Sequence, residues 1–276
     1  MPLHATVTEP LSGSTVNTDS LLLGGSFVGP ENTGITVNGI VALLDGDKFY
    51  VNNLPLKPGQ NTLTITLTAP DGTTRTQTVT VTSAGKNPLQ VSVEPQSGVA
   101  PLTTRFTPTL NNGRILQRID TDANGDGTTD LTITDPTQPV EYSYATPGVY
   151  RPRITATDSQ GQTYTQTLVV AVQDPQKMDQ FFTAIWNGMN NALKGGDVNA
   201  AVRYLNESAK RKYQPVFQAL LPRMGEIVAS YSPLYRLSVT EDIGEYAIQR
   251  PYNGGSRVYL IYFLKDADGV WRVEGM

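Results

Sequence analysis

The chain has 276 residues, a formal net charge of −4 and no cysteine. Charged residues make up 17% of it, below the roughly 25% of an average soluble domain. The acidic balance argues against a nucleic-acid partner, and the lack of cysteine excludes disulfides, thiolate zinc sites and cysteine nucleophiles. No apolar run reaches the about 18 residues that a membrane span needs. The length allows two or three domains, each with a core of its own.

Residues 1–84 contain strand signals only, separated by turns rich in Gly, Asn, Pro and Asp. Asn38-Gly39 between two apolar stretches is a strong hairpin signal, and Asp71-Gly72 predicts another. The alternation of Thr with Leu or Ile over Thr62–Thr68 predicts a strand with one buried face. This pattern indicates an antiparallel β-sandwich. The stretches VTEPLSGSTVNTDSLLLGGSF, ITVNG and DKFYVNNLPLKPGQNTLTITL resemble the bacterial Ig-like domain found beside glucodextranase catalytic domains.

A second domain is predicted over residues 88–174, after a short polar linker. The stretch Gly148–Gly161 reads as a turn, a strand and a second turn, and Thr163–Val172 reads as the last strand. Together with EYSYATPGVY and APLTTRFTP, these residues resemble a PKD domain, an immunoglobulin-like β-sandwich common on secreted and surface-exposed microbial proteins. Four residues of the first strand alternate toward the expected core: Tyr150, Pro152, Ile154 and Ala156.

Residues 176–276 change to helical spacing and then return to strands. A helix is predicted up to Gly195-Gly196, which supplies a C-terminal stop, and further short helices follow to Ala229. Helices followed by an antiparallel meander indicate an α+β domain. The closing RVYLIYFLKDADGVWRVEGM resembles the last strands of an NTF2-like (cystatin-like) domain, in which a curved sheet wraps a long helix. The predicted strands are Leu234–Thr240, Ile243–Gln249, Arg257–Leu264 and Val270–Glu274.

One loop of the PKD-like segment concentrates oxygen side chains at alternate positions, with glycine at the turn. Calcium requires several oxygen ligands at about 2.3–2.6 Å, and glycine lets a short loop bring them together. The loop resembles the D-x-D-G-D-G-x-x-D run of PKD-like domains, with one inserted residue. The alternative is a solvated turn in which Asp and Gly serve only as turn formers. The candidate calcium ligands are Asp120, Asp122, Asn124, Asp126 and Asp130.

The NTF2-like resemblance implies a conical cavity between helix and sheet, which in some relatives holds a catalytic acid or base. The alternative is that the aromatic residues simply fill the cone. The single histidine, His4, lies at the N-terminal end, so no Ser-His-Asp triad is expected. No catalytic or cofactor-binding residue is therefore assigned. Candidates to line such a cavity are Trp186, Tyr204, Tyr231, Tyr246, Tyr259, Tyr262, Arg236, Glu245 and Arg257.

These features predict a multidomain protein with two immunoglobulin-like sandwiches followed by an α+β domain. We expect a non-catalytic, exported array, extracellular, on the cell surface or periplasmic, that serves as a spacer, in adhesion and in protein interaction. We also expect the chain to be part of a longer protein and to be monomeric. A carbohydrate-binding accessory region of a polysaccharide-active protein is the main alternative, and an NTF2-like enzyme is a third.

Overall fold

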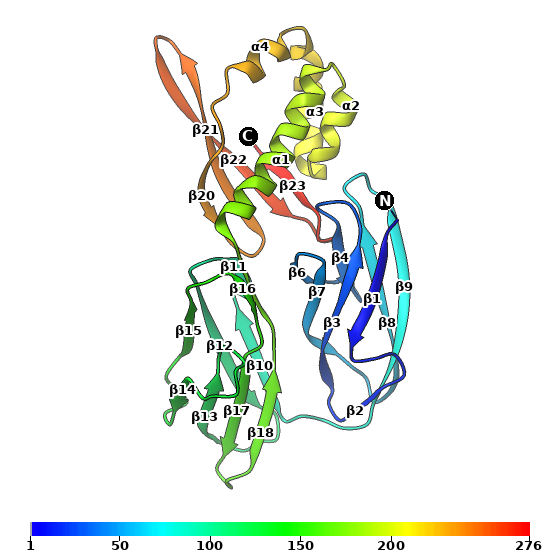
Figure 1. Cartoon of the computed structure of the whole chain (residues 1–276), viewed down its shortest axis with the longest axis vertical. Helices are drawn as coiled ribbons and strands as arrows, with labels where there is room; N and C mark the ends of the chain where they lie inside the picture. The colour runs from blue at the N-terminus through cyan, green and yellow to red at the C-terminus, as the bar shows by residue number, and fades with distance from the viewer. Residues whose placement is uncertain (1) are drawn as a thin grey trace. The chain divides into compact units, whose positions relative to one another are not determined.

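The computed structural model describes residues 2–276, which form two compact units (Figure 1). The predicted fold class is confirmed, because β-sandwiches make up the first unit and an α+β domain forms most of the second. Of the described residues, the first unit comprises 2–29, Ile35–Leu67 and Thr74–Asp174. The second comprises Pro30–Gly34, Thr68–Thr73 and Pro175–Met276.

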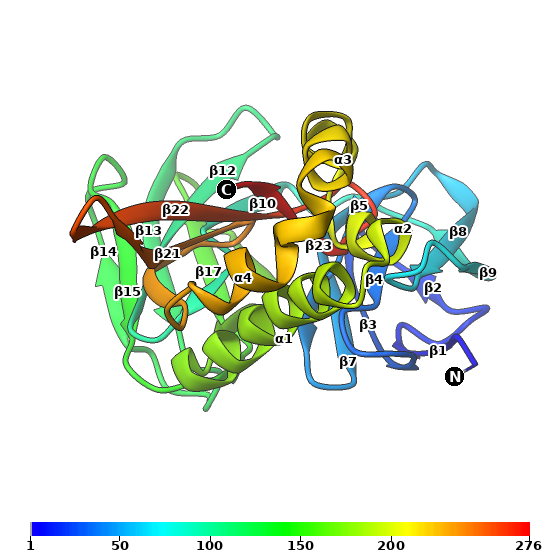
Figure 2. The same cartoon turned by 90° about the horizontal axis from the view of Figure 1, so that it is seen from above.

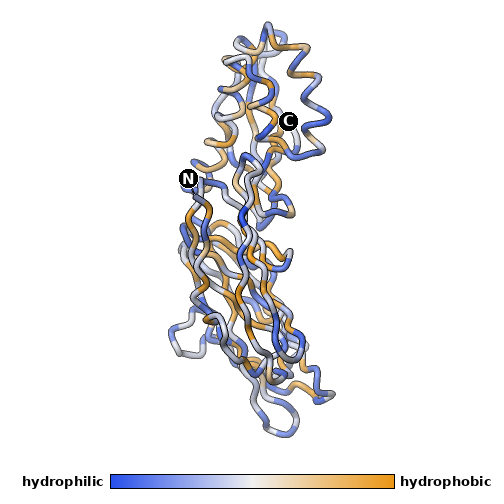
Figure 3. Tube along the Cα trace, turned by 90° about the vertical axis from the view of Figure 1, so that its right-hand side faces the viewer, coloured by the Kyte–Doolittle hydropathy of each residue, from blue (hydrophilic) through white to orange (hydrophobic). Residues whose placement is uncertain are grey.

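The first sandwich consists of two sheets that enclose buried Leu23, Ile35, Phe49 and Ile65. Apolar and polar residues alternate along its strands, as the hydropathy colouring shows (Figure 3), and this places one face of each sheet in the core. One sheet has the order β1 (His4–Glu9), β3 (Ser20–Val28), β7 (Lys48–Pro55), β6 (Leu43–Asp45). The other has the order β2 (Thr15–Val16), β9 (Thr74–Ser83), β8 (Gly59–Thr68), β4 (Gly34–Val37), β5 (Ile40–Val41).

The predicted Asn38-Gly39 hairpin is confirmed. Val37 of β4 pairs with Ile40 of β5, and the two turn residues have φ angles of 50° and 83°. Positive φ at both central positions is what a two-residue turn between twisted strands requires, and Asn and Gly adopt it readily. The local sequence therefore favours this turn, and two hydrogen bonds between Asn38 and Thr64 of the neighbouring strand, each 2.9 Å, also hold it.

The second sandwich is built from three sheets around buried Phe106, Tyr144, Ile154 and Val170. The first two are β10 (Leu89–Glu94), β12 (Leu102–Leu110), β15 (Val140–Tyr144), and β11 (Ser97–Val99), β19 (Val170–Gln173), β16 (Gly148–Tyr150). The third is β14 (Leu131–Ile133), β13 (Leu116–Asp122), β17 (Arg153–Asp158), β18 (Thr163–Thr167).

The prediction of a single strand after Gly148 is wrong, because the structure divides this stretch into two strands at Arg151-Pro152. β16 pairs with β19, whereas β17 pairs with β13 and β18. Proline lacks the N–H that a continuous ladder needs, so the chain changes sheets there. The predicted last strand divides in the same way into β18 and β19, and Leu168 N–H bonds the Pro152 carbonyl at the crossover. Ile154 and Ala156 are buried as predicted.

Asp158 organises the turn that follows β17. Its fully buried carboxylate accepts the backbone N–H groups of Gln160 and Gln162, the Tyr164 hydroxyl and the Arg114 guanidinium. Burial opposes ionisation, but these donors outweigh it and lower the pKa of Asp158 to about 2. The side chain is therefore a fixed structural anion.

Within the first unit the two sandwiches share a junction built on one buried asparagine, Asn52 of β7. Its amide donates to the Val169 carbonyl and to Gln96 Oε1, each at 2.8 Å, and its carbonyl accepts the Val169 N–H at 2.8 Å. Asn53 donates to the Val91 carbonyl at 2.8 Å. Side-chain amides that pair with a neighbouring backbone fix position, because they satisfy a donor and an acceptor together.

Apolar side chains complete this junction. Leu43 and Tyr50 of the first sandwich form a buried cluster with Val169 and Ala171 of the second. At its margin Arg151 makes a bidentate ion pair with Glu9, with both N–O distances at 2.7 Å. Burial of apolar surface supplies the driving force for such contacts, and the hydrogen bonds set the register.

The second unit places helices against one four-stranded antiparallel sheet, as seen from above in Figure 2. Its strands are β20 (Tyr235–Val239), β21 (Ile243–Tyr252), β22 (Gly255–Lys265) and β23 (Trp271–Gly275). Its helices are α1 (Pro175–Lys194), α2 (Val198–Ala201), α3 (Glu207–Leu220) and α4 (Met224–Ala229), with 3₁₀ turns at Val202–Tyr204 and Leu221–Arg223. The helices and strands that the sequence predicted here are confirmed, with ends shifted by a few residues. No helix among residues 2–276 has both the length and the apolar character to cross a membrane.

Candidate functional site

The five candidate calcium ligands lie at the end of β13 and in the loop that follows. Asp120 forms an ion pair with Arg118 at 2.8 Å and accepts a hydrogen bond from the Thr132 hydroxyl. Its carboxylate therefore bonds residues of the strands β13 and β14 and not residues of the loop. The Arg118 hydrogen bond is the main reason that the pKa of Asp120 is lowered. Asp122 instead faces the loop, where it accepts the backbone N–H groups of Gly125, Asp126 and Gly127.

The other three candidates also hold the loop to itself. Asp126 accepts the Thr128 N–H, the main cause of its lowered pKa, and the Asn124 side-chain amide. Asp130 accepts the Ala123 N–H at 2.7 Å. Throughout residues 2–276, no group of three or more acidic, histidine or cysteine side chains converges on one point. A cation would therefore have to displace some of these internal hydrogen bonds, and calcium binding stays a prediction.

The calcium prediction is tested by the melting temperature of the first unit. If the loop binds Ca²⁺, an excess of about a hundredfold over Kd stabilises the folded state by about 2.7 kcal/mol. Asp126→Asn removes one charge and one of the two acceptor oxygens of Asp126, so it should abolish a calcium-induced rise measured against its own metal-free transition. The measurement is calorimetry of the full chain in EDTA and in millimolar Ca²⁺.

The Asp122→Ala variant tests how much this loop contributes to stability in the absence of metal. Because three backbone N–H groups lose their acceptor, we expect it to destabilise the first unit by about 1–3 kcal/mol without any metal. Coincident wild-type curves with and without Ca²⁺, combined with a destabilised Asp122→Ala variant, would show that the acidic residues serve only to form the turn.

Aromatic side chains pack between helix α1 and the sheet, where the sequence predicted a conical cavity. Phe182 lies 4.7 Å from Phe263 and 5.2 Å from Tyr246 between ring centroids, and Trp186 packs on Tyr231. Tyr246 is 1% exposed; burial raises its pKa, as does the hydrogen bond that it donates to Asp179. These contacts fit the alternative in which aromatic residues fill the cone.

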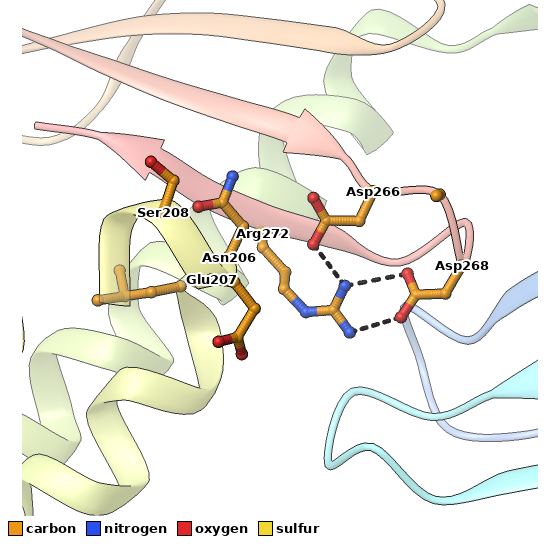
Figure 4. A pocket seen from close by; sticks show the side chains of 8 residues that line it. Asn206, Glu207, Ser208, Asp266, Asp268 and Arg272 are labelled. Carbon is orange, nitrogen blue, oxygen red and sulfur yellow. Dashed lines mark hydrogen bonds and ion pairs between the residues drawn. The ribbon is translucent and has the colours of Figure 1, made fainter. Parts of the chain in front are cut away.

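A pocket of about 550 Å³ opens elsewhere in the second unit, beside the start of α3 and the β22–β23 turn (Figure 4). Asn206 caps α3 by accepting the Ala209 N–H, and its amide donates to Glu274. Six of the eight residues that line the pocket are polar or charged; the lining consists of Leu205, Asn206, Glu207, Ser208, Asp266, Ala267, Asp268 and Arg272.

Arg272 is the central charge of this pocket, and two carboxylates hold it. Its guanidinium lies 2.7 Å from Asp266 and makes a bidentate contact with Asp268 at 2.8 and 3.0 Å (Figure 4). Burial raises the pKa of Asp266 despite the ion pair. Burial also opposes ionisation of Asp268, but hydrogen bonds from Arg272 and the Val270 N–H outweigh it and lower the pKa of Asp268.

These groups can bind a polar ligand, but they do not form a nucleophile–base pair. No histidine is among the residues that line the pocket with Ser208. With Glu207, Asp266 and Asp268 against Arg272, the lining is net acidic. The sequence pattern DADGVWR marked the turn but did not reveal that Arg272 folds back onto both aspartates.

No family model matches the chain, and no curated protein matches it. Among solved structures, fibronectin(III)-like modules of Clostridium thermocellum CbhA are 14% identical, covering 63% of this chain and 96% of theirs, with a TM-score of 0.26. The PKD domain of the human receptor SorCS2 is 22% identical, covering 32% and 73%, with a TM-score of 0.27. Bacteroides ovatus SGBP-B, solved with a mixed-linkage heptasaccharide, is 16% identical, covering 62% and 47%, with a TM-score of 0.22. Similarities this weak carry no argument about function.

Proposed function

We propose that this chain is a non-catalytic, exported spacer and adhesion module. Its paired sandwiches form a stiff scaffold, and its NTF2-like α+β domain makes protein–protein contacts. The observation that carries the proposal is the Asn52 junction, because reciprocal hydrogen bonds and a buried apolar cluster hold two sandwiches as one body. A spacer that keeps its two domains in a fixed arrangement needs such a junction, whereas independent domains on a flexible linker do not.

Distances between spin labels test the stiffness of this scaffold. Because the chain has no cysteine, Thr74→Cys in the first sandwich and Thr107→Cys in the second can be labelled cleanly at exposed positions. The expected result is a distance distribution as narrow as that of Thr107→Cys with Thr163→Cys, a pair within one sandwich. A distribution much broader than this reference would overturn the spacer proposal.

The polar pocket favours glycan binding as a second candidate function. Carboxylate, amide and hydroxyl groups can bond adjacent sugar hydroxyls, although no aromatic residue lines the pocket for stacking. A glycan array probed with the full chain separates the two functions. Binding to one sugar class that disappears in a Glu207→Gln, Ser208→Ala double variant and persists in Arg211→Met, on the exposed side of α3, would replace the spacer proposal.

A further inference from the structure

The β21–β22 hairpin has an edge that no strand covers. β22 pairs with β21 over its whole length, from Ile243 opposite Leu264 to Tyr252 opposite Gly255. On its other side, β23 covers only Tyr262–Lys265. Seven residues, Gly255–Ile261, thus have no strand partner on that side within residues 2–276. An uncovered edge presents alternate backbone N–H and C=O groups, which are a template for a further strand.

This edge lacks most of the devices that prevent strand addition. Gly255–Ile261 contains no proline and no lysine, and the only irregularity in the β22–β23 ladder lies beyond it, at Tyr262/Phe263. The opposite side of the hairpin differs, because Ser232 bonds both the N–H and the C=O of Gln249 and closes that edge of β21. Strand addition is thus directed to one side of the hairpin.

Apolar side chains stand exposed along the same strand. Val258 is 56% exposed and Leu260 45% exposed. Leu260 pairs with Ala247, which is 6% exposed, and Ala247 pairs with Tyr235, which is 53% exposed. Exposed Leu260 and Tyr235 thus flank a buried alanine in an apolar row across the sheet. An added strand would place every second side chain against this row.

The charge of the hairpin specifies the character of the partner. No acidic residue occurs between Glu245 and Asp266, whereas Arg250 and Arg257 do. The Arg257 guanidinium lies 4.3 Å from the Tyr252 ring centroid, at the hairpin tip. Two copies of this chain would bring like charges together, while an acidic strand would complement them.

We propose that the β22 edge, Gly255–Ile261, binds an extended acidic peptide segment of another protein by β-strand addition. The peptide's backbone bonds the open edge, its apolar residues pack beside Val258 and Leu260, and its carboxylates face Arg257. This inference rests on the protein-interaction part of the proposed function and names the class of partner. It does not depend on the junction between the sandwiches.

A displayed library of random peptides of about seven residues, the length of the open edge, tests the proposal with the full chain as bait. We expect selected peptides to alternate apolar and acidic residues. N-methylation of alternate backbone nitrogens in such a peptide should abolish binding in one register and spare it in the other. Val258→Gln with Leu260→Gln, which removes the apolar side chains without adding charge, should weaken binding by about tenfold or more.

The matched control is Val216→Gln, at a 44% exposed position on α3 of the same unit. Arg257→Glu, which leaves the apolar residues in place, should shift selection from acidic to basic peptides. Failure to enrich any peptide, binding unaffected by the Val258→Gln, Leu260→Gln double variant, or self-association of the chain through this edge would each overturn the proposal. The spin-label distances of the sandwiches would be unchanged in all these variants, so failure here is distinguishable from failure of the spacer function.

Discussion

Asn52→Ala should destabilise the first unit by about 2–4 kcal/mol. The substitution removes the acceptor of the fully buried Val169 N–H and the donor to the Val169 carbonyl, and it leaves Gln96 without the Asn52 amide. Each buried polar group left unpaired costs about 1–3 kcal/mol. Calorimetry of the full chain should show the melting transition of the first unit lowered by about 5–15 °C, at about 2–4 °C per kcal/mol for a unit of this size.

The same variant should separate the two sandwiches, so that their unfolding no longer coincides. Asn17→Ala is the matched control, because Asn17 is exposed on the first sandwich, and we expect its effect to stay within about 0.5 kcal/mol. If the Asn52→Ala variant melts at the same temperature as the wild-type chain, the apolar cluster alone holds the junction.

Arg272→Met should destabilise the second unit by about 2–4 kcal/mol at neutral pH. The Arg272 side chain is only 14% exposed, and its loss leaves Asp266 and Asp268 facing each other without a countercharge. Breaking a buried ion pair costs about 3–5 kcal/mol, and the lower value expected here reflects the partial exposure of both carboxylates. Urea unfolding of the full chain, followed by the fluorescence of Trp186 and Trp271 in the second unit, measures the effect.

The destabilisation by Arg272→Met should diminish as the pH falls. Without the guanidinium, two adjacent carboxylates raise each other's folded pKa above the usual Asp value of about 3.9. A carboxyl with a raised folded pKa carries no penalty below its unfolded pKa and gains one as the pH rises through the folded pKa. Arg211→Met, at an exposed position on α3, should show neither the loss nor the pH dependence. A pH-independent loss in Arg272→Met would indicate lost packing rather than charge.

The sequence alone determined the features that depend on neighbouring residues. Asn38-Gly39 specifies its hairpin because both residues adopt positive φ, and the spacing of Phe182, Trp186 and Met189 defines the buried side of α1. The alternation in β8 and β17 likewise predicts which side chains enter a core. Such signals are local, so one stretch of chain is enough to reveal them.

Tertiary structure decided what depends on residues far apart in the chain. Asn52 and Val169 are separated by 117 positions, and no local pattern shows that an asparagine will pair with that backbone. The uncovered edge of β22 follows from where β23 begins to pair, and the orientation of Arg272 follows from the turn that brings two aspartates to it. In the acidic loop, composition indicated metal ligands, but backbone N–H groups compete for the same oxygens. Only the folded geometry shows which donors reach those oxygens, because each contact depends on the placement of the whole surrounding domain.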